Sequence, residues 1–154
     1  MSKPQSRRYD RETISRKRGG MTFHSLLVIK AVVCLFFGAI LLAFPGLLFG
    51  MLGTVLNAGG MFTAREYGAA LIGTLLLTWF AKDVTASDAR HAILLDLLVY
   101  DSIGVVITFV AAASGVLNAL GWGIVVVYLF FAVGSGYLLI TNGSSILGRG
   151  QREG

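Results

Sequence analysis

Charged residues are scarce in this sequence, and cysteine, histidine and proline are nearly absent from it. Only 14% of the residues are charged, compared with about 25% in a typical soluble domain, whereas 55% are hydrophobic. The single cysteine, Cys34, excludes an internal disulfide, and one cysteine with two histidines argues against a zinc site. No constellation of nucleophile, acid and base is apparent, so we expect no catalytic, cofactor-binding or metal-binding residues.

The net charge of +5 arises at the N-terminus, where seven basic residues stand against Asp10 and Glu12. We expect residues 1–21 to form a cytoplasmic arm that contacts anionic lipid headgroups, since each such residue near the surface contributes about 1 kcal/mol. Nucleic acid is not an expected partner, because Tyr9 is the only aromatic residue among these charges. The expected headgroup contacts are Arg7, Arg8, Arg11, Arg16, Lys17 and Arg18.

Long apolar runs dominate the remainder of the chain, and they predict an all-α fold. Each run is long enough for the roughly 20 residues that cross a bilayer as a helix, and none alternates as a transmembrane β-strand would. We expect a four-helix transmembrane bundle over residues 22–141, in which Pro45 kinks or ends the first helix. The four predicted helices are about 25–49, 62–81, 92–113 and 119–140.

The loop charges predict the orientation of these helices. Residues 50–60 and 114–118 carry no charge, whereas basic residues occur in the 82–91 loop and in the tail, 142–154. Because basic residues mark the cytoplasmic side, we expect an inner-membrane protein with both termini in the cytoplasm.

An internal repeat relates the two halves of the chain. Residues 55–58 and 116–119 both read Val-Leu-Asn-Ala, and the same offset of 61 pairs Tyr67 with Tyr128 and Gly73 with Gly134. The chain is therefore interpreted as two tandem helical hairpins of equal orientation, each turning at an asparagine that can cap the following helix. Chance similarity in a chain rich in glycine and leucine is the alternative.

Ionisable residues inside the predicted helices need a reason, because each costs roughly 2.5–3.5 kcal/mol on insertion scales. Lys30 and Asp96 lie at similar depth, so we expect them to pair, with snorkelling of Lys30 to the headgroups as the alternative. Asp101 lies deeper, so it is protonated, hydrogen-bonded between helices or paired with a cation. Arg65 leans away from it, and Glu66 faces a different direction.

Glycines recur in all four predicted helices. Two small-x-x-x-small patterns, Ala69 to Gly73 and Ala132 to Gly136, allow helices to approach closely. We expect Gly68, Gly73, Gly134 and Gly136 to pack helices, either within this chain or against another membrane subunit.

A family resemblance follows from short motifs. Arg65-x-x-Gly68 near the start of the second helix, Gly121-Trp122 near the start of the fourth, and four short helices resemble small bacterial membrane proteins of the DoxX-like kind. The resemblance covers roughly residues 22–141. It implies a bacterial inner-membrane protein, and some members act as small subunits of larger redox assemblies.

These observations favour an accessory or scaffold subunit of a larger membrane complex, respiratory or photosynthetic, with other subunits or a second copy as partners. The alternative is a small transporter or carrier whose path includes Asp101, Arg65 and Glu66. The least favoured hypothesis is an enzyme acting on a lipid or quinone, for which His91, Asp88 and Asp83 are the candidate groups.

Overall fold

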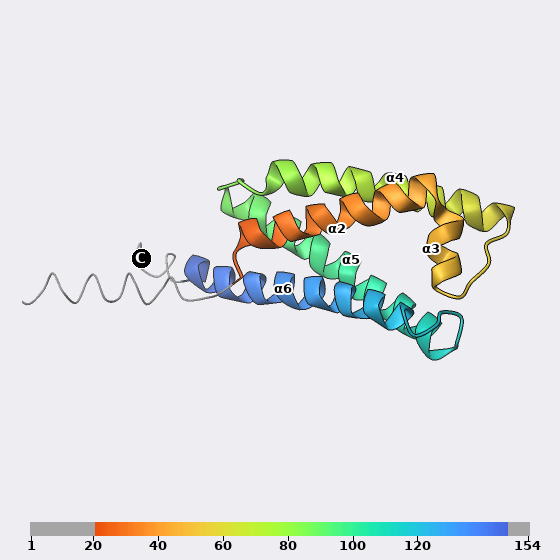
Figure 1. The fold of residues 1–154 in the computed structure, drawn as a ribbon. Coiled ribbons are helices and arrows are strands. Elements are labelled where there is room, and N and C mark those ends of the chain that lie inside the picture. Colours follow the sequence, from red (N-terminus) through yellow and green to blue (C-terminus); the bar gives the residue numbers. More distant parts are fainter. Residues whose placement is uncertain (1–20, 148–154) are drawn as a thin grey trace, which may run out of the picture.

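The computed structural model describes residues 21–147, and this part of the chain consists entirely of helices and their connections (Figure 1). The expected headgroup contacts Arg7, Arg8, Arg11, Arg16, Lys17 and Arg18 lie outside the described residues, as does the end of the tail from 148 onward. In chain order the described helices are α2 (Phe23–Ala43), α3 (Pro45–Met51), α4 (Ala58–Ala81), α5 (Ser87–Ala113) and α6 (Gly121–Leu147).

The first predicted helix is two helices. Thr22 begins α2, and its hydroxyl accepts a hydrogen bond from the Ser25 amide at 3.1 Å. Pro45 lacks a backbone N–H and cannot continue the α2 ladder, but it suits the first turn of a new helix. The chain therefore breaks at Phe44 and restarts as α3. The expected effect of Pro45 is confirmed, and the single helix 25–49 is corrected.

Each of the other three helices extends beyond one of its predicted ends, although α6 begins at Gly121, two residues later than expected. Asn57 starts α4 at Ala58, four residues earlier than expected, because its side chain caps the Gly60 amide at 2.8 Å. The helix α5 starts at Ser87 rather than at 92, and α6 continues to Leu147, into the segment assigned to the tail. Polar residues at helix ends do not interrupt backbone hydrogen bonding, so apolar runs underestimate helix length.

Three of the described helices are long and apolar enough to cross a membrane: Phe23–Ala43, Ser87–Ala113 and Gly121–Thr141. The helix α4 is comparable in length, but Arg65 and Glu66 lower its hydropathy. Its continuous apolar stretch begins only at Tyr67. These observations support the expected membrane protein.

The long helices associate in two pairs, α2 with α4 and α5 with α6 (Figure 1). The two pairs come into close backbone contact where α2 lies beside α6. A buried apolar cluster that includes Phe23, Leu97 and Phe131 joins α2, α5 and α6 near the start of α2. A second cluster, with Cys34, Leu41 and Leu71, belongs to the α2–α4 pair. The apolar contact between pairs is therefore strongest at one end.

The two turn regions meet at the opposite end of the molecule. The Asn118 amide donates to the Leu52 carbonyl at 2.9 Å, and its side chain donates to the Met51 carbonyl at 2.8 Å. The Thr54 hydroxyl donates to the Val116 carbonyl at 2.6 Å. Gly53 and Gly115 have φ values of 81° and 76°, which glycine adopts at little cost. The second Val-Leu-Asn-Ala corner thus contacts residues 51–54, which lead from α3 into the first corner.

Candidate functional site

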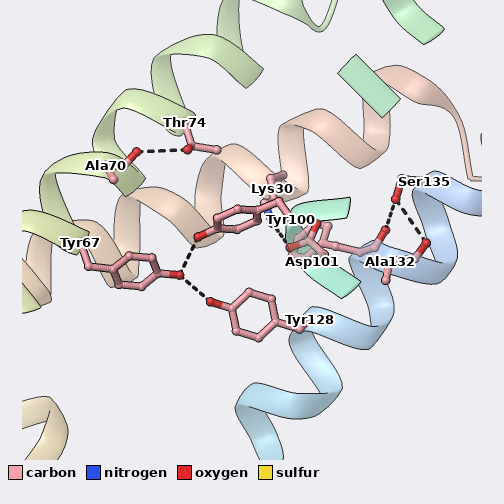
Figure 2. Close-up of polar contacts among 10 residues, drawn as sticks. Lys30, Tyr67, Ala70, Thr74, Tyr100, Asp101, Tyr128, Ala132 and Ser135 are labelled. Atoms are coloured by element: carbon pink, nitrogen blue, oxygen red, sulfur yellow. Dashed lines mark hydrogen bonds and ion pairs between the residues drawn. The ribbon is translucent and has the colours of Figure 1, made fainter. Parts of the chain in front are cut away.

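The deepest polar contact joins the two helix pairs through Lys30 of α2 and Asp101 of α5 (Figure 2). Lys30 Nζ donates to Asp101 Oδ1. The side chain of Lys30 is 4% exposed and that of Asp101 is fully buried. A pair removed from water in this way neutralises both charges, and loss of either partner would leave the other uncompensated.

The local sequence explains why Asp101 faces inward. On α5 it follows the buried residues Leu94 and Leu97 at spacings of three and four, so all three lie on one face. Asp96 lies on the opposite face and is exposed. The expected pairing of Lys30 with Asp96 is therefore wrong, because residues at equal depth can lie on opposite sides of a helix. Of the alternatives for Asp101, the paired cation is correct.

Aromatic rings enclose the Lys30 ammonium group. Its Nζ lies 5.2 Å from the centroid of the Tyr100 ring and 4.4 Å from that of Phe131. Both distances permit attraction between the cation and the negative face of the ring. The second carboxylate oxygen, Asp101 Oδ2, is buried and accepts no hydrogen bond from the described residues. The site therefore compensates the cation more completely than the anion.

Three tyrosines extend the polar contact across the molecule. The Tyr67 hydroxyl of α4 lies 2.6 Å from that of Tyr100 on α5 and 2.5 Å from that of Tyr128 on α6 (Figure 2). Either oxygen of each pair can be the donor. Because Tyr100 also contacts Lys30, we name Lys30, Tyr67, Tyr100, Asp101 and Tyr128 the polar layer. It includes one side chain or more from each of the four long helices.

The tyrosine contacts were not predicted, although the sequence contains a signal for them. Tyr67 and Tyr128 occupy equivalent positions of the 61-residue repeat, and their hydroxyls meet between the two pairs. A pseudo-twofold relation brings equivalent positions together where they lie near its axis. A polar residue that recurs at the repeat offset is therefore a candidate for contact between repeats.

Nearby buried hydroxyls are satisfied within their own helices. Ser135 donates to the Phe131 carbonyl at 2.7 Å, and Thr78 donates to the Thr74 carbonyl at 2.8 Å. Neither contributes a contact to the polar layer. Both show how a helix accommodates a buried hydroxyl without an interhelical partner.

The other predicted intramembrane charges do not join the polar layer. Arg65 and Glu66 are exposed on α4, and among the described residues neither forms an ion pair or side-chain hydrogen bond. The predicted grouping of Asp101 with Arg65 and Glu66 is therefore not present in the described structure. Gly68, three residues further on, packs against Leu41 and Leu42 of α2. Arg65 and Glu66 consequently lie near the level of the α2 C-terminus.

The predicted packing glycines fall into two groups. A Cβ added to Gly68 would meet Leu42 N at 2.9 Å, and one added to Gly134 would clash with Met21 and meet Leu26 Cδ1 at 3.1 Å. Gly136 lies closest to Leu98 of α5. These three pack helices within the chain. Gly73 is exposed and a Cβ there would meet no atom within 4 Å, so its surface is open.

The enzyme candidates lie at the end of the molecule where α2 begins. Asp83 pairs with His24 at 3.6 Å and with Lys82 at 3.0 Å; His24 and Asp83 are exposed, and Lys82 is partly buried. His91 and Asp88 are exposed on the first turns of α5. Among the described residues, no group of three or more histidine, cysteine or acidic side chains could hold a metal ion.

In comparisons with known proteins, no family model matches this chain, and no curated protein or solved structure gives a significant match, so the resemblance to DoxX-like proteins stays a prediction.

Proposed function

We propose that this chain is a non-catalytic subunit of a larger inner-membrane assembly and that it acts by packing against other membrane chains. The observation that carries the proposal is the polar layer. It links the two helix pairs through an ion pair and two hydroxyl contacts. The four long helices therefore behave as one block, in which the buried charges of Lys30 and Asp101 are paired and the outer faces are free for partners.

The outer faces support this function by their composition. Large apolar side chains are exposed along all four long helices, among them Phe36, Phe80, Val106 and Val133. In a bilayer, such surfaces contact lipid or other apolar helices. The connections are short, so partner contact through the membrane-embedded faces is favoured over a soluble active site.

We further propose that all four long helices cross the membrane, with both termini in the cytoplasm. Asp83, just after α4, pairs with His24 at the start of α2, whereas Gly68, in the first half of α4, packs against Leu41 and Leu42 near the end of α2. The helix α4 therefore runs the length of α2 in reverse. If α2 and α5 cross from the same side, α4 must return the chain. Arg65 and Glu66 then lie near the outer membrane surface, where charge is tolerated.

Single-cysteine labelling in intact cells tests this topology. In a Cys34→Ala background, Val55→Cys should react with an impermeant maleimide from outside, since Val55 is 95% exposed. Thr85→Cys should react only after the membrane is opened. Equal protection of both positions, or the reverse pattern, would contradict four crossings with cytoplasmic termini.

Gentle extraction tests the subunit function. A tagged full-length chain, removed from its native membrane in mild detergent, should migrate with larger membrane proteins that remain bound through washing. A chain recovered as a monomer, or only with copies of itself, would contradict the proposal.

A second function is favoured by one specific observation, the buried Asp101 Oδ2 that accepts no hydrogen bond from the described residues. Secondary transporters bind substrates and coupling ions at the interface between repeats, which is where Asp101 lies. A proton-linked carrier would therefore use Asp101, Lys30 and the tyrosines. Proteoliposomes with Asp101→Asn should then lose proton-linked flux, and wild-type flux in that variant would exclude the carrier.

A further inference from the structure

The outward face of α4 has the periodicity of a helix-docking seam. Exposed residues cover most of α4, and six of those on the side away from α2 are spaced alternately four and three positions apart, which is the heptad spacing of helices that pack side by side. The opposite face of α4, with Ala64, Gly68 and Leu71, packs against α2. We name the outward residues the α4 seam: Phe62, Glu66, Ala69, Gly73, Leu76 and Phe80.

The centre of the α4 seam is shaped for close approach. Ala69 and Gly73 are exposed, and a Cβ at Gly73 would meet no atom within 4 Å. Phe62 and Phe80, which are 63% and 77% exposed, flank this small-residue centre toward the two ends of the helix. A partner helix could therefore approach the middle of the seam while contacting the two rings.

Charge identifies the partner. Arg65 adjoins the seam directly beside Glu66, and neither forms an ion pair within the described residues. With this spacing Glu66 falls at an a position of the heptad, and in a parallel pair an a residue packs beside the g residue that precedes its counterpart on the other helix. Glu66 of one copy would thus meet Arg65 of a second copy, and the reciprocal contact would form by symmetry. Copies inserted in the same membrane share their orientation, as a parallel pair requires.

The internal repeat provides an independent argument. Gly73 corresponds to Gly134 at the 61-residue offset, and Gly134 is covered by Met21 and by Leu26 of α2. The same position thus receives a neighbouring segment in the second repeat and is open in the first. The charged residues Arg65 and Glu66 occur only on the exposed face of the first repeat. Val126 and Val127 occupy the equivalent positions in the second repeat.

From these observations we infer that the α4 seam is a self-association surface, which docks a second copy of this chain as a parallel, twofold-symmetric dimer. The inference rests on the proposed packing function and names one partner for it. An isologous contact of this kind is self-complementary and closes at two copies.

Charge exchange gives the decisive test. The full-length chain is reconstituted in liposomes over a range of protein-to-lipid ratios, and dimer is measured by energy transfer between labelled copies. Arg65→Glu or Glu66→Arg alone should weaken association roughly tenfold, since two ion pairs are lost and like charges face one another. The double exchange Arg65→Glu/Glu66→Arg should restore it. Mixing the two single variants should give mixed dimers in preference to self-pairs.

A steric series tests the close approach separately. Gly73→Leu should weaken association, whereas Gly123→Leu is the matched control, because Gly123 of α6 is also exposed with no atom within 4 Å of an added Cβ. Tryptophan fluorescence of each variant checks that the monomer is folded.

Two results would overturn the inference: a wild-type chain that stays monomeric at every ratio, or a double exchange as weak as the single variants. A wild-type monomer that instead binds a different membrane chain through this face would also overturn it, while leaving the proposed subunit function intact. Conversely, a dimer extracted without other subunits supports the seam and contradicts the subunit function.

Discussion

Replacement of the two charged residues in the polar layer should reveal how strongly the helix pairs are coupled. Lys30→Met leaves the fully buried Asp101 carboxylate without its cation, and Asp101→Asn leaves the buried ammonium facing a neutral amide. Breaking a buried pair by removing one partner costs about 3–5 kcal/mol. We expect Lys30→Met to lie in this range and Asp101→Asn at its lower end, because asparagine can still accept one hydrogen bond from Lys30.

The double variant Lys30→Met/Asp101→Asn carries no charge at this position, so its free energy of unfolding should fall by much less than the sum of the single effects. We expect a coupling energy of about 2 kcal/mol or more, since side chains in direct contact are strongly non-additive. Unfolding in mixed micelles with increasing dodecyl sulfate measures each term, with Trp79 and Trp122 as the fluorescent reporters.

A matched control is available at the surface of the same protein. Lys82 and Asp83 lie 3.0 Å apart, but the Asp83 side chain is 69% exposed, so solvent screens the pair. The cycle of Lys82→Met and Asp83→Asn should give less than about 1 kcal/mol of coupling. If the coupling between Lys30 and Asp101 is no larger than that of the control, the reasoning about the polar layer is refuted.

Three further perturbations test the contacts around this layer. Tyr67→Phe removes both hydroxyl contacts and should lower the free energy of unfolding by about 1–2 kcal/mol. Tyr137→Phe alters an exposed ring and should change the free energy of unfolding little. Equal effects of the two variants would contradict the role of Tyr67 as the partner of both other tyrosines. Gly68→Ala brings a Cβ to 2.9 Å from Leu42 N and should lower the free energy of unfolding by about 1–3 kcal/mol. Gly123→Ala, where an added Cβ meets no atom within 4 Å, is the control and should have little effect. A Gly68→Ala variant as stable as the wild type would mean that α2 and α4 are not in contact there. Asn118→Ala removes the bonds to the Met51 carbonyl and from the Leu120 amide, so it should cost more than Asn57→Ala, which removes one cap bond. Thermal unfolding in detergent ranks the two variants, and the reverse order would argue against contact between Asn118 and the end of α3.

The helical fold could be predicted from the sequence, because backbone N–H and C=O groups in long hydrophobic segments must form hydrogen bonds within the segment when lipid surrounds them. The sequence also indicated the break at Pro45, since the missing N–H is a local property. The helix ends were less accurate. Helices extend past the apolar residues wherever a capping side chain such as Asn57 allows, and this depends on backbone geometry rather than hydropathy.

The site was predicted in part, and the error has a definite cause. Lys30 and Asp101 were both identified as ionisable residues inside predicted helices, but depth alone led to the expectation that Lys30 pairs with Asp96 or extends to the headgroups. The periodicity of Leu94, Leu97 and Asp101 contains the missing information, because it identifies the inward face of α5. The tyrosine contacts also require the relative placement of the repeats, which no local pattern contains.

The polar layer combines one symmetric contact, between Tyr67 and Tyr128, with the asymmetric ion pair and the asymmetric contact of Tyr67 with Tyr100, and the difference bears on how the two repeats are held. Tyr67 and Tyr128 are equivalent under the repeat, so their contact would survive exchange of the two helix pairs. The ion pair would not, because His91 and Ile40 occupy the positions equivalent to Lys30 and Asp101. The Tyr67–Tyr128 contact alone therefore permits more than one way of docking two similar hairpins, whereas the ion pair stabilises a single arrangement. That role matches the best-attested use of buried charges, which is to select one packing among near-equivalent alternatives.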